Sequence, residues 1–233
     1  MSETLTKVSN CIEEGGQIHH VVVNAGKIVA MQTDLQLRQS VNESDLVNAD
    51  GQAVVWASRF LGKPLKERVA GIDLMINLVQ LAHKKGYKIF FFGAKEDVVK
   101  AVVNTYTNQY SSNIIAGYRN GYFKKEEELD IARQISNSGA HILFVAISSP
   151  NKENFLYDNK DILKNVNFIM GVGGSFDVVS GKIKRAPLWM QTYGLEWFYR
   201  FLQEPRRMWK RYLVGNTVFI YLILKEKVKT AFD

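Results

Sequence analysis

The sequence predicts an α/β fold with a mainly parallel sheet, helices on both of its faces and a helical C-terminal appendage. Short apolar runs alternate with longer segments of helical period, as buried parallel strands and their crossover helices do. Hydrophobic residues make up 46% of the 233 residues and charged residues 23%, which is enough for a packed core. After Gly181 the alternation stops. The fold prediction depends on these three observations.

The elements follow in chain order. Five apolar runs are predicted to be strands: 19–24, 88–93, 113–117, 141–147 and 166–171. A shorter run at 46–48 resembles them. Helical period predicts six helices between them: 27–39, 52–61, 72–85, 96–110, 126–136 and 151–163. Beyond them we expect an aromatic helix over 188–203, a break at Pro205 and another helix over 206–229. The domains are therefore a core, 1–194, and an appendage, 195–233, and disorder is expected only in the first few residues.

The positive charge is confined to the C-terminal part of the chain. Residues 1–181 contain 19 Lys and Arg against 19 Asp and Glu, whereas residues 182–233 contain 11 against 4, so the net charge of +7 arises there. Three of the four tryptophans, Trp189, Trp197 and Trp209, lie in the same part. Basic and aromatic residues together suit the headgroup boundary of an anionic membrane. Single-stranded nucleic acid is bound by the same residue types, and packing onto the core is the structural alternative.

Other sequence features limit the location of the protein. Cys11 is the only cysteine, so an internal disulfide is excluded. We find no signal peptide, and the apolar runs are shorter than the roughly 18–20 residues of a membrane-spanning helix. These features predict a cytoplasmic protein.

Polar residues follow several predicted strands, where parallel sheets bind ligands. Asn24 follows the first strand, Asp50-Gly51 follows 46–48, and Lys152 comes shortly after the strand 141–147. Asp50 is the candidate general base, because a strand-to-helix corner directs a carboxylate toward bound substrate. The alternative is a turn or a helix cap, since Asp-Gly is a common turn pair.

A glycine-rich run, G-V-G-G-S-F-D, begins at Gly171. Gly171, Gly173 and Gly174 would let backbone N–H groups approach a phosphate, although a tight turn explains the same glycines. The run lacks the spacing of a dinucleotide or P-loop motif. The sequence also lacks D-x-D and H-E-x-x-H, so no metal site and no cofactor are expected. Cations such as Arg68, Lys152 and the tail arginines would then bind a diphosphate.

Several long blocks resemble the WecG/TagA/CpsF glycosyltransferases. They are N-A-D-G-Q-A-V-V from Asn48, G-K-P-L-K-E-R-V-A-G-I-D-L from Gly62, G-V-G-G-S-F-D-V-V-S-G-K-I-K-R-A-P-L-W-M from Gly171 and G-L-E-W-F-Y-R-F-L-Q-E-P-R-R from Gly194. The resemblance extends over nearly the whole chain from about residue 19.

The resemblance implies a Rossmann-like core and an inverting transfer of a sugar from a UDP-sugar to a sugar linked to polyprenyl (undecaprenyl) diphosphate, in cell-surface polysaccharide synthesis. It places the catalytic aspartate at Asp50, the conserved asparagine at Asn24 and a substrate-binding arginine at Arg68. The tail arginines Arg206, Arg207 and Arg211 are further candidates for the diphosphate. The resemblance also implies a peripheral protein on the inner face of the cell membrane, with no nucleic-acid partner, and leaves a homo-oligomer open.

Two positions depart from the family pattern. Val22 replaces the threonine of T-x-N, and Lys152 replaces the glutamine of P-K-Q-E. The transferred hexose therefore stays open among N-acetylmannosamine, its uronic acid, glucose, N-acetylglucosamine and similar sugars. Two other functions remain as alternatives. One is a different nucleotide-binding enzyme such as a dehydrogenase, against which the missing glycine motif counts. The other is a non-catalytic membrane or nucleic-acid adaptor on the same fold.

Overall fold

The computed structural model describes residues 1–232, apart from the side chains of Arg207, Lys210, Arg211, Ala231 and Phe232. The chain forms two compact units, described separately below. Unit 1 comprises 1–21, 39–47 and 71–182, and unit 2 comprises 22–38, 48–70 and 183–233. The chain passes from one unit to the other within its first two strands.

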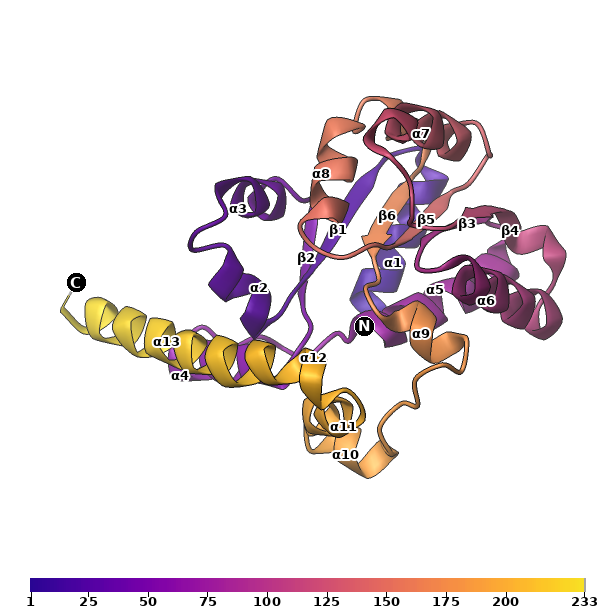
Figure 1. The fold of residues 1–233 in the computed structure, drawn as a ribbon. Coiled ribbons are helices and arrows are strands. Elements are labelled where there is room, and N and C mark those ends of the chain that lie inside the picture. The colour runs from indigo at the N-terminus through magenta and orange to yellow at the C-terminus, as the bar shows by residue number, and fades with distance from the viewer. Residues whose placement is uncertain (233) are drawn as a thin grey trace. The chain divides into compact units, whose positions relative to one another are not determined.

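A six-stranded sheet in the order β2-β1-β6-β5-β3-β4 confirms the predicted fold class (Figure 1). Its strands are β1 (Ile18–Val23), β2 (Leu46–Ala49), β3 (Ile89–Gly93), β4 (Ile115–Arg119), β5 (Ile142–Ala146) and β6 (Phe168–Gly171). The pairs β1–β6, β6–β5, β5–β3 and β3–β4 are parallel. Parallel pairing requires crossover connections, and the predicted alternation of strands and helices reflects them.

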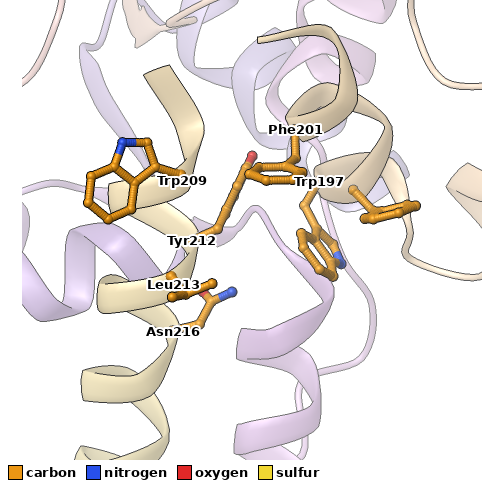
Figure 2. A pocket seen from close by; sticks show the side chains of 7 residues that line it. Trp197, Phe201, Trp209, Tyr212, Leu213 and Asn216 are labelled. Carbon is orange, nitrogen blue, oxygen red and sulfur yellow. The ribbon is translucent and has the colours of Figure 1, made fainter. Parts of the chain in front are cut away.

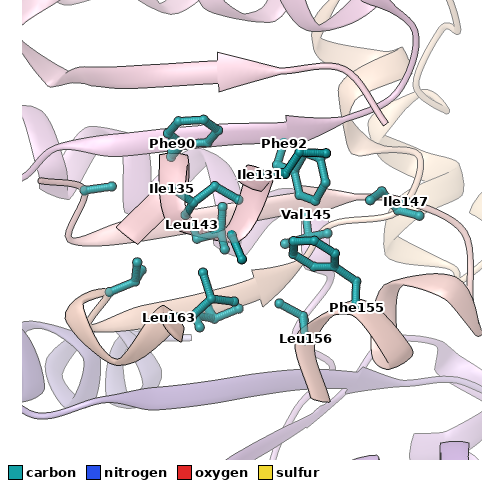
Figure 3. Packing of buried hydrophobic residues seen from close by; sticks show 14 residues of the cluster. Phe90, Phe92, Ile131, Ile135, Leu143, Val145, Ile147, Phe155, Leu156 and Leu163 are labelled. Carbon is teal, nitrogen blue, oxygen red and sulfur yellow. The ribbon is translucent and has the colours of Figure 1, made fainter. Parts of the chain in front are cut away.

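Successive phenylalanines of β3 bury against opposite faces of the unit 1 sheet. Phe90 and Phe92 join a cluster with residues of α7 (Glu128–Ser136), α8 (Asn151–Asp158) and the 3₁₀ turn η3 (Ile162–Asn165) (Figure 3). Phe91 points the other way, where its ring lies 5.8 Å from that of Tyr106 on α6 (Glu96–Gln109) and 5.9 Å from that of Phe176 on α9 (Ser175–Val179). The strand is apolar without alternation because both faces are covered.

The N-terminus is helical, which the sequence prediction of disorder missed. Helix α1 (Ser2–Glu13) contacts α5 (Gly71–Lys85) and β6. Val8 and Ile12 are buried one helical turn apart, and the Glu13 carboxylate accepts a hydrogen bond from Lys85 Nζ at 2.9 Å. This helix is stabilised by tertiary packing of one apolar face, which its short sequence alone does not reveal.

Three predicted helices are interrupted. The helix expected over 27–39 is two helices, α2 (Ala25–Ala30) and α3 (Leu35–Asn42), because the Asp34 carboxylate accepts a hydrogen bond from the Leu37 N–H at 2.9 Å and starts the second one. The helix expected over 151–163 ends at Asp158 and is followed by η3. The helix expected over 188–203 is divided by Gly194 (φ +72°) into α10 (Leu188–Thr192) and α11 (Glu196–Gln203).

Unit 2 is built around the C-terminal helices. Past the predicted break, α12 (Pro205–Trp209), the π-helical turn η4 (Lys210–Val214) and α13 (Gly215–Phe232) follow one another directly. Phe219 and Ile223 of α13 pack on Ala25 of α2 and on Ala57 of α4 (Gln52–Phe60), and Figure 1 shows α13 running beside α4. Two short 3₁₀ turns, η1 (Ser112–Ile114) and η2 (Lys125–Glu127), belong to unit 1.

Candidate functional site

The corner after β1 and β2 brings Asn24 and the Asp50-Gly51 turn together in unit 2. The Asp50 N–H donates to the Val23 carbonyl at 2.9 Å, so the two strand ends are joined there. Asn24 caps α2, its Oδ1 accepting from the Lys27 N–H at 3.0 Å. Gly51 precedes α4 and has φ +142°, a conformation that other residues rarely adopt. A Cβ built on it would lie 3.7 Å from Asn24 Cβ. The side chain of Asp50 is half-buried.

Next to the same corner, two arginines contact one carboxylate. The Val69 N–H donates to the Ala49 carbonyl at 3.0 Å, which holds the segment containing Arg68 beside the end of β2. Arg68 Nη1 lies 3.4 Å from Glu196 Oε2, and Arg185 Nε lies 3.2 Å from Glu196 Oε1. All three side chains are largely buried, at 19%, 23% and 27% exposed for Arg68, Arg185 and Glu196. Two guanidinium groups therefore share one carboxylate.

Sequence reasoning singled out Arg68 but missed Arg185 and Glu196. Both lie inside blocks that carry the family resemblance, which was the available signal. Gly194, just before α11, explains why this segment approaches the corner so closely. A Cβ built on Gly194 would lie 2.8 Å from Gln52 Cγ, and Gln52 is the first residue of α4, two positions after Asp50.

An apolar groove lies farther along α11. Trp197, Phe198 and Phe201 of α11 face Trp209, Tyr212, Leu213 and Asn216 across a space of about 270 Å³ (Figure 2). The rings of Trp197 and Tyr212 meet edge to face with centroids 5.5 Å apart. The sequence drew attention to these aromatic residues but gave no indication that they line a groove.

Unit 1 contributes a buried ion pair beside the glycine run. Lys152 Nζ lies 3.1 Å from Glu153 Oε1, with side chains only 10% and 2% exposed. A Cβ built on Gly171, the last residue of β6, would lie 2.6 Å from Lys152 Cδ and Cε and 2.7 Å from Nζ. The lysine side chain therefore passes directly over the Gly171 backbone. The Lys152 charge lies at the carboxyl end of β6, next to one predicted phosphate contact.

The remaining glycines form the turn between β6 and α9. Gly173 has φ +53° and open space at its Cβ position, whereas Gly174 precedes α9 with φ −80°. The Ser175 hydroxyl donates to the Val172 carbonyl at 2.7 Å, which closes the turn. Because α9 has only five residues, its dipole contributes little. Phosphate binding by these amides stays a prediction.

The tail arginines are only partly described. Arg206 is exposed on α12, whereas the side chains of Arg207 and Arg211 lie outside the described part of the chain. Within the described residues, no three His, Cys, Asp or Glu side chains gather as a metal site. Among residues 1–232, none of the helices combines the length and apolar character needed to cross a membrane.

Two groups of unit 1 whose pKa is shifted by burial, Tyr106 and His141, lie away from its strand carboxyl ends. Burial raises the pKa of the Tyr106 phenol, which lies within α6 and stacks on Phe91. Burial, followed by the charge of Lys88, lowers the pKa of His141, whose Nδ1 accepts a hydrogen bond from the Lys88 N–H at 3.0 Å. His141 precedes β5 and so belongs to the amino end of that strand. Both residues support packing.

An all-parallel α/β sheet with polar corners after its strands is an arrangement common among enzymes that bind nucleotides. The chain belongs to the WecG/TagA/CpsF family of glycosyl transferases, whose family model matches residues 1–232. It is therefore a glycosyltransferase, and the dehydrogenase alternative no longer applies.

Two relatives from Bacillus are similar over most of this chain. One, from Bacillus subtilis (strain 168), is 38% identical over 192 residues, which is 82% of this chain and 73% of the relative. The other, from Bacillus spizizenii (strain W23), is 38% identical over 191 residues, which is 82% of this chain and 72% of the relative. Each is named an N-acetylglucosaminyldiphosphoundecaprenol N-acetyl-beta-D-mannosaminyltransferase.

Proposed function

We propose that this glycosyltransferase moves N-acetylmannosamine or a closely related hexose from a UDP-sugar to N-acetylglucosamine linked to undecaprenyl diphosphate. The 38% identity to two mannosaminyltransferases of that acceptor supports the proposed substrates. Lys152 replaces the glutamine of the family pattern. The uronic acid, glucose and other hexoses therefore remain among the donors to be tested.

The observation that carries the mechanism is the Asp50 corner. In a single displacement, Asp50 takes the proton of the acceptor hydroxyl while that oxygen bonds to the anomeric carbon. The bond from this carbon to the UDP oxygen breaks on the opposite face, and UDP leaves with the electron pair. The configuration at the anomeric carbon is thereby inverted. A carboxylate is basic enough because the hydroxyl loses its proton only as the new bond forms.

Cationic side chains are the proposed phosphate contacts, and each unit is considered by itself. In unit 2 these are Arg68 and Arg185, which already surround a carboxylate at 3.4 and 3.2 Å. In unit 1 it is Lys152, next to the Gly171 backbone. Fixed cations stabilise the charge that develops on the leaving diphosphate. Asn24 supports the corner through its cap on α2 and is a proposed substrate contact.

The appendage is proposed to hold the enzyme on the inner face of the cell membrane. Large apolar side chains of η4 and α13 are more than half exposed: Leu213, Ile220, Tyr221 and Leu224. The basic excess of residues 182–233 complements anionic lipid. Association with the surface would bring the enzyme to a lipid-linked acceptor.

Replacement of Asp50 by Asn tests the mechanism. Asp50→Asn removes the base but keeps the shape of the side chain, so we expect normal folding and a loss of turnover of about 10²–10⁴-fold. Transfer is followed with several UDP-sugars and an undecaprenyl-diphosphate-linked N-acetylglucosamine. The matched control is Asp45→Asn, because Asp45 accepts a backbone hydrogen bond from His19 in unit 1 and has no proposed role.

Two outcomes would contradict the proposal. Turnover near that of the unmodified enzyme in Asp50→Asn would leave Asp50 as a turn residue. Retained UDP-sugar binding without any transfer by the unmodified protein would favour the adaptor alternative.

A further inference from the structure

The groove between α11 and the α12–η4–α13 segment has apolar walls that are open to solvent. Trp209 is 50% exposed and Leu213 is 69% exposed. Among the described side chains that line it, Asn216 is the one amide and the others are aromatic or aliphatic (Figure 2). Apolar surface left open in this way commonly marks a binding site.

Helix α13 has a packing cluster that does not include the residues lining the groove. Helix α13 packs on α2 and α4 through Phe219 and Ile223. The groove residues lie on α11, α12, η4 and the first turn of α13, and among them Trp197 contacts Tyr212 edge to face. The two walls meet at this ring contact, and a space of about 270 Å³ beside it is open to a ligand.

Charge at the start of α11 indicates what kind of ligand fits. Glu196, the first residue of α11, lies between Arg68 and Arg185, and the next residue, Trp197, lines the groove. Two guanidinium groups thus lie on the first residue of the helix whose next residue lines the groove. This combination complements a molecule that carries a phosphate group at the end of an apolar chain.

We infer that the groove binds the first isoprene units of the acceptor's prenyl chain, with the diphosphate directed toward the arginines at the start of α11. The inference rests on the proposed function, which supplies a prenyl diphosphate as the acceptor carrier. A volume of about 270 Å³ accommodates only part of such a chain. The rest of the chain remains in the membrane.

Acceptors with and without an isoprenoid group test the inference in the absence of vesicles. N-acetylglucosamine diphosphate is supplied as its geranyl ester and as its methyl ester, with the full-length chain as enzyme. In Phe201→Ala and Trp209→Ala we expect the KM for the geranyl acceptor to rise about tenfold, as for removal of an aromatic contact from a binding surface. The KM for the methyl acceptor and that for the donor should not change.

Leu202→Ala and Leu129→Ala are the matched controls, because these leucines are 59% and 44% exposed and do not line the groove. Both should behave as the unmodified enzyme with every acceptor. Binding is also measured directly, as quenching of tryptophan fluorescence by geranyl diphosphate without donor. In Phe201→Ala, which retains every tryptophan, the concentration of geranyl diphosphate that gives half-maximal quenching should rise about tenfold.

Several outcomes would overturn the inference. An unchanged KM for the geranyl acceptor in both groove variants, together with unchanged quenching in Phe201→Ala, would exclude a prenyl site. A defect that appears only when vesicles are added would assign the groove to membrane contact, and a changed oligomeric state would assign it to a second copy of the chain. Absence of transfer by the unmodified enzyme would refute the proposed function, whereas the fluorescence titration would still decide whether the groove binds a prenyl chain.

Discussion

Substitution of Gly171 by alanine should displace Lys152 from its buried position. The new Cβ would lie 2.6 Å from Lys152 Cδ and Cε, whereas carbon atoms in favourable contact are about 3.5–4.0 Å apart. The lysine must therefore move by about 1 Å, and its 3.1 Å contact with Glu153 must change. Overpacking of this kind typically lowers the free energy of unfolding by about 1–3 kcal/mol. For a chain of this size, a loss of 2 kcal/mol lowers the melting temperature by about 4–8 °C.

Thermal unfolding of matched variants measures this effect. Gly215→Ala is the control, because Gly215 is helical and has open space at its Cβ position, so the same substitution should cost nothing there. The decisive comparison places Gly171→Ala in a Lys152→Ala background. If the clash with Lys152 causes the loss of stability, Gly171→Ala should lower the free energy of unfolding only slightly in the Lys152→Ala background.

The two variants also connect this contact to catalysis. If Lys152 binds the donor phosphates, Gly171→Ala should raise the KM for the UDP-sugar, and adding Lys152→Ala should raise it little further. An equal loss of stability from Gly171→Ala in both backgrounds would refute the structural reasoning. A donor KM that is unchanged in Gly171→Ala and in Lys152→Ala would remove Lys152 from the proposed substrate contacts.

Two further predictions concern metal and membrane. Transfer should continue in excess chelator, because arginine and lysine side chains are the proposed partners of the diphosphate; loss of activity that magnesium or manganese restores would contradict this. The full-length chain should sediment with phosphatidylglycerol vesicles at low salt and less at high salt, since the Debye length falls to about 3 Å at molar ionic strength. Truncation before Leu195 should abolish sedimentation, and equal recovery of both forms would exclude the membrane role of the appendage.

The strands of the core were predictable because their signal is local. A buried parallel strand needs a short apolar run, and Ile89–Gly93 and Ile142–Ala146 both fall inside predicted strands. Helix ends were less predictable, since the division between α2 and α3 depends on one side-chain hydrogen bond from Leu37 to Asp34. Helix α1 was missed because its stability comes from packing on α5 and β6.

The residues of the candidate site were likewise predictable only where their signal is local. Asn24 and Asp50 were found from sequence because each directly follows a strand, and adjacent strand ends in a parallel sheet lie close together. Glu196 was not found, because it is 128 positions from Arg68 and nothing local relates them.

The sequence by itself determined the fold class, the family resemblance, the confinement of the positive charge to residues 182–233 and the strand-end position of Asp50. These properties follow from composition, order and short-range period. The tertiary structure alone decided that Arg68 and Arg185 share Glu196, that Lys152 covers Gly171 and that aromatic residues of α11 and η4 enclose a groove. Each of these contacts joins segments that come together only after the chain has folded, so their geometry depends on the packing of whole helices and strands.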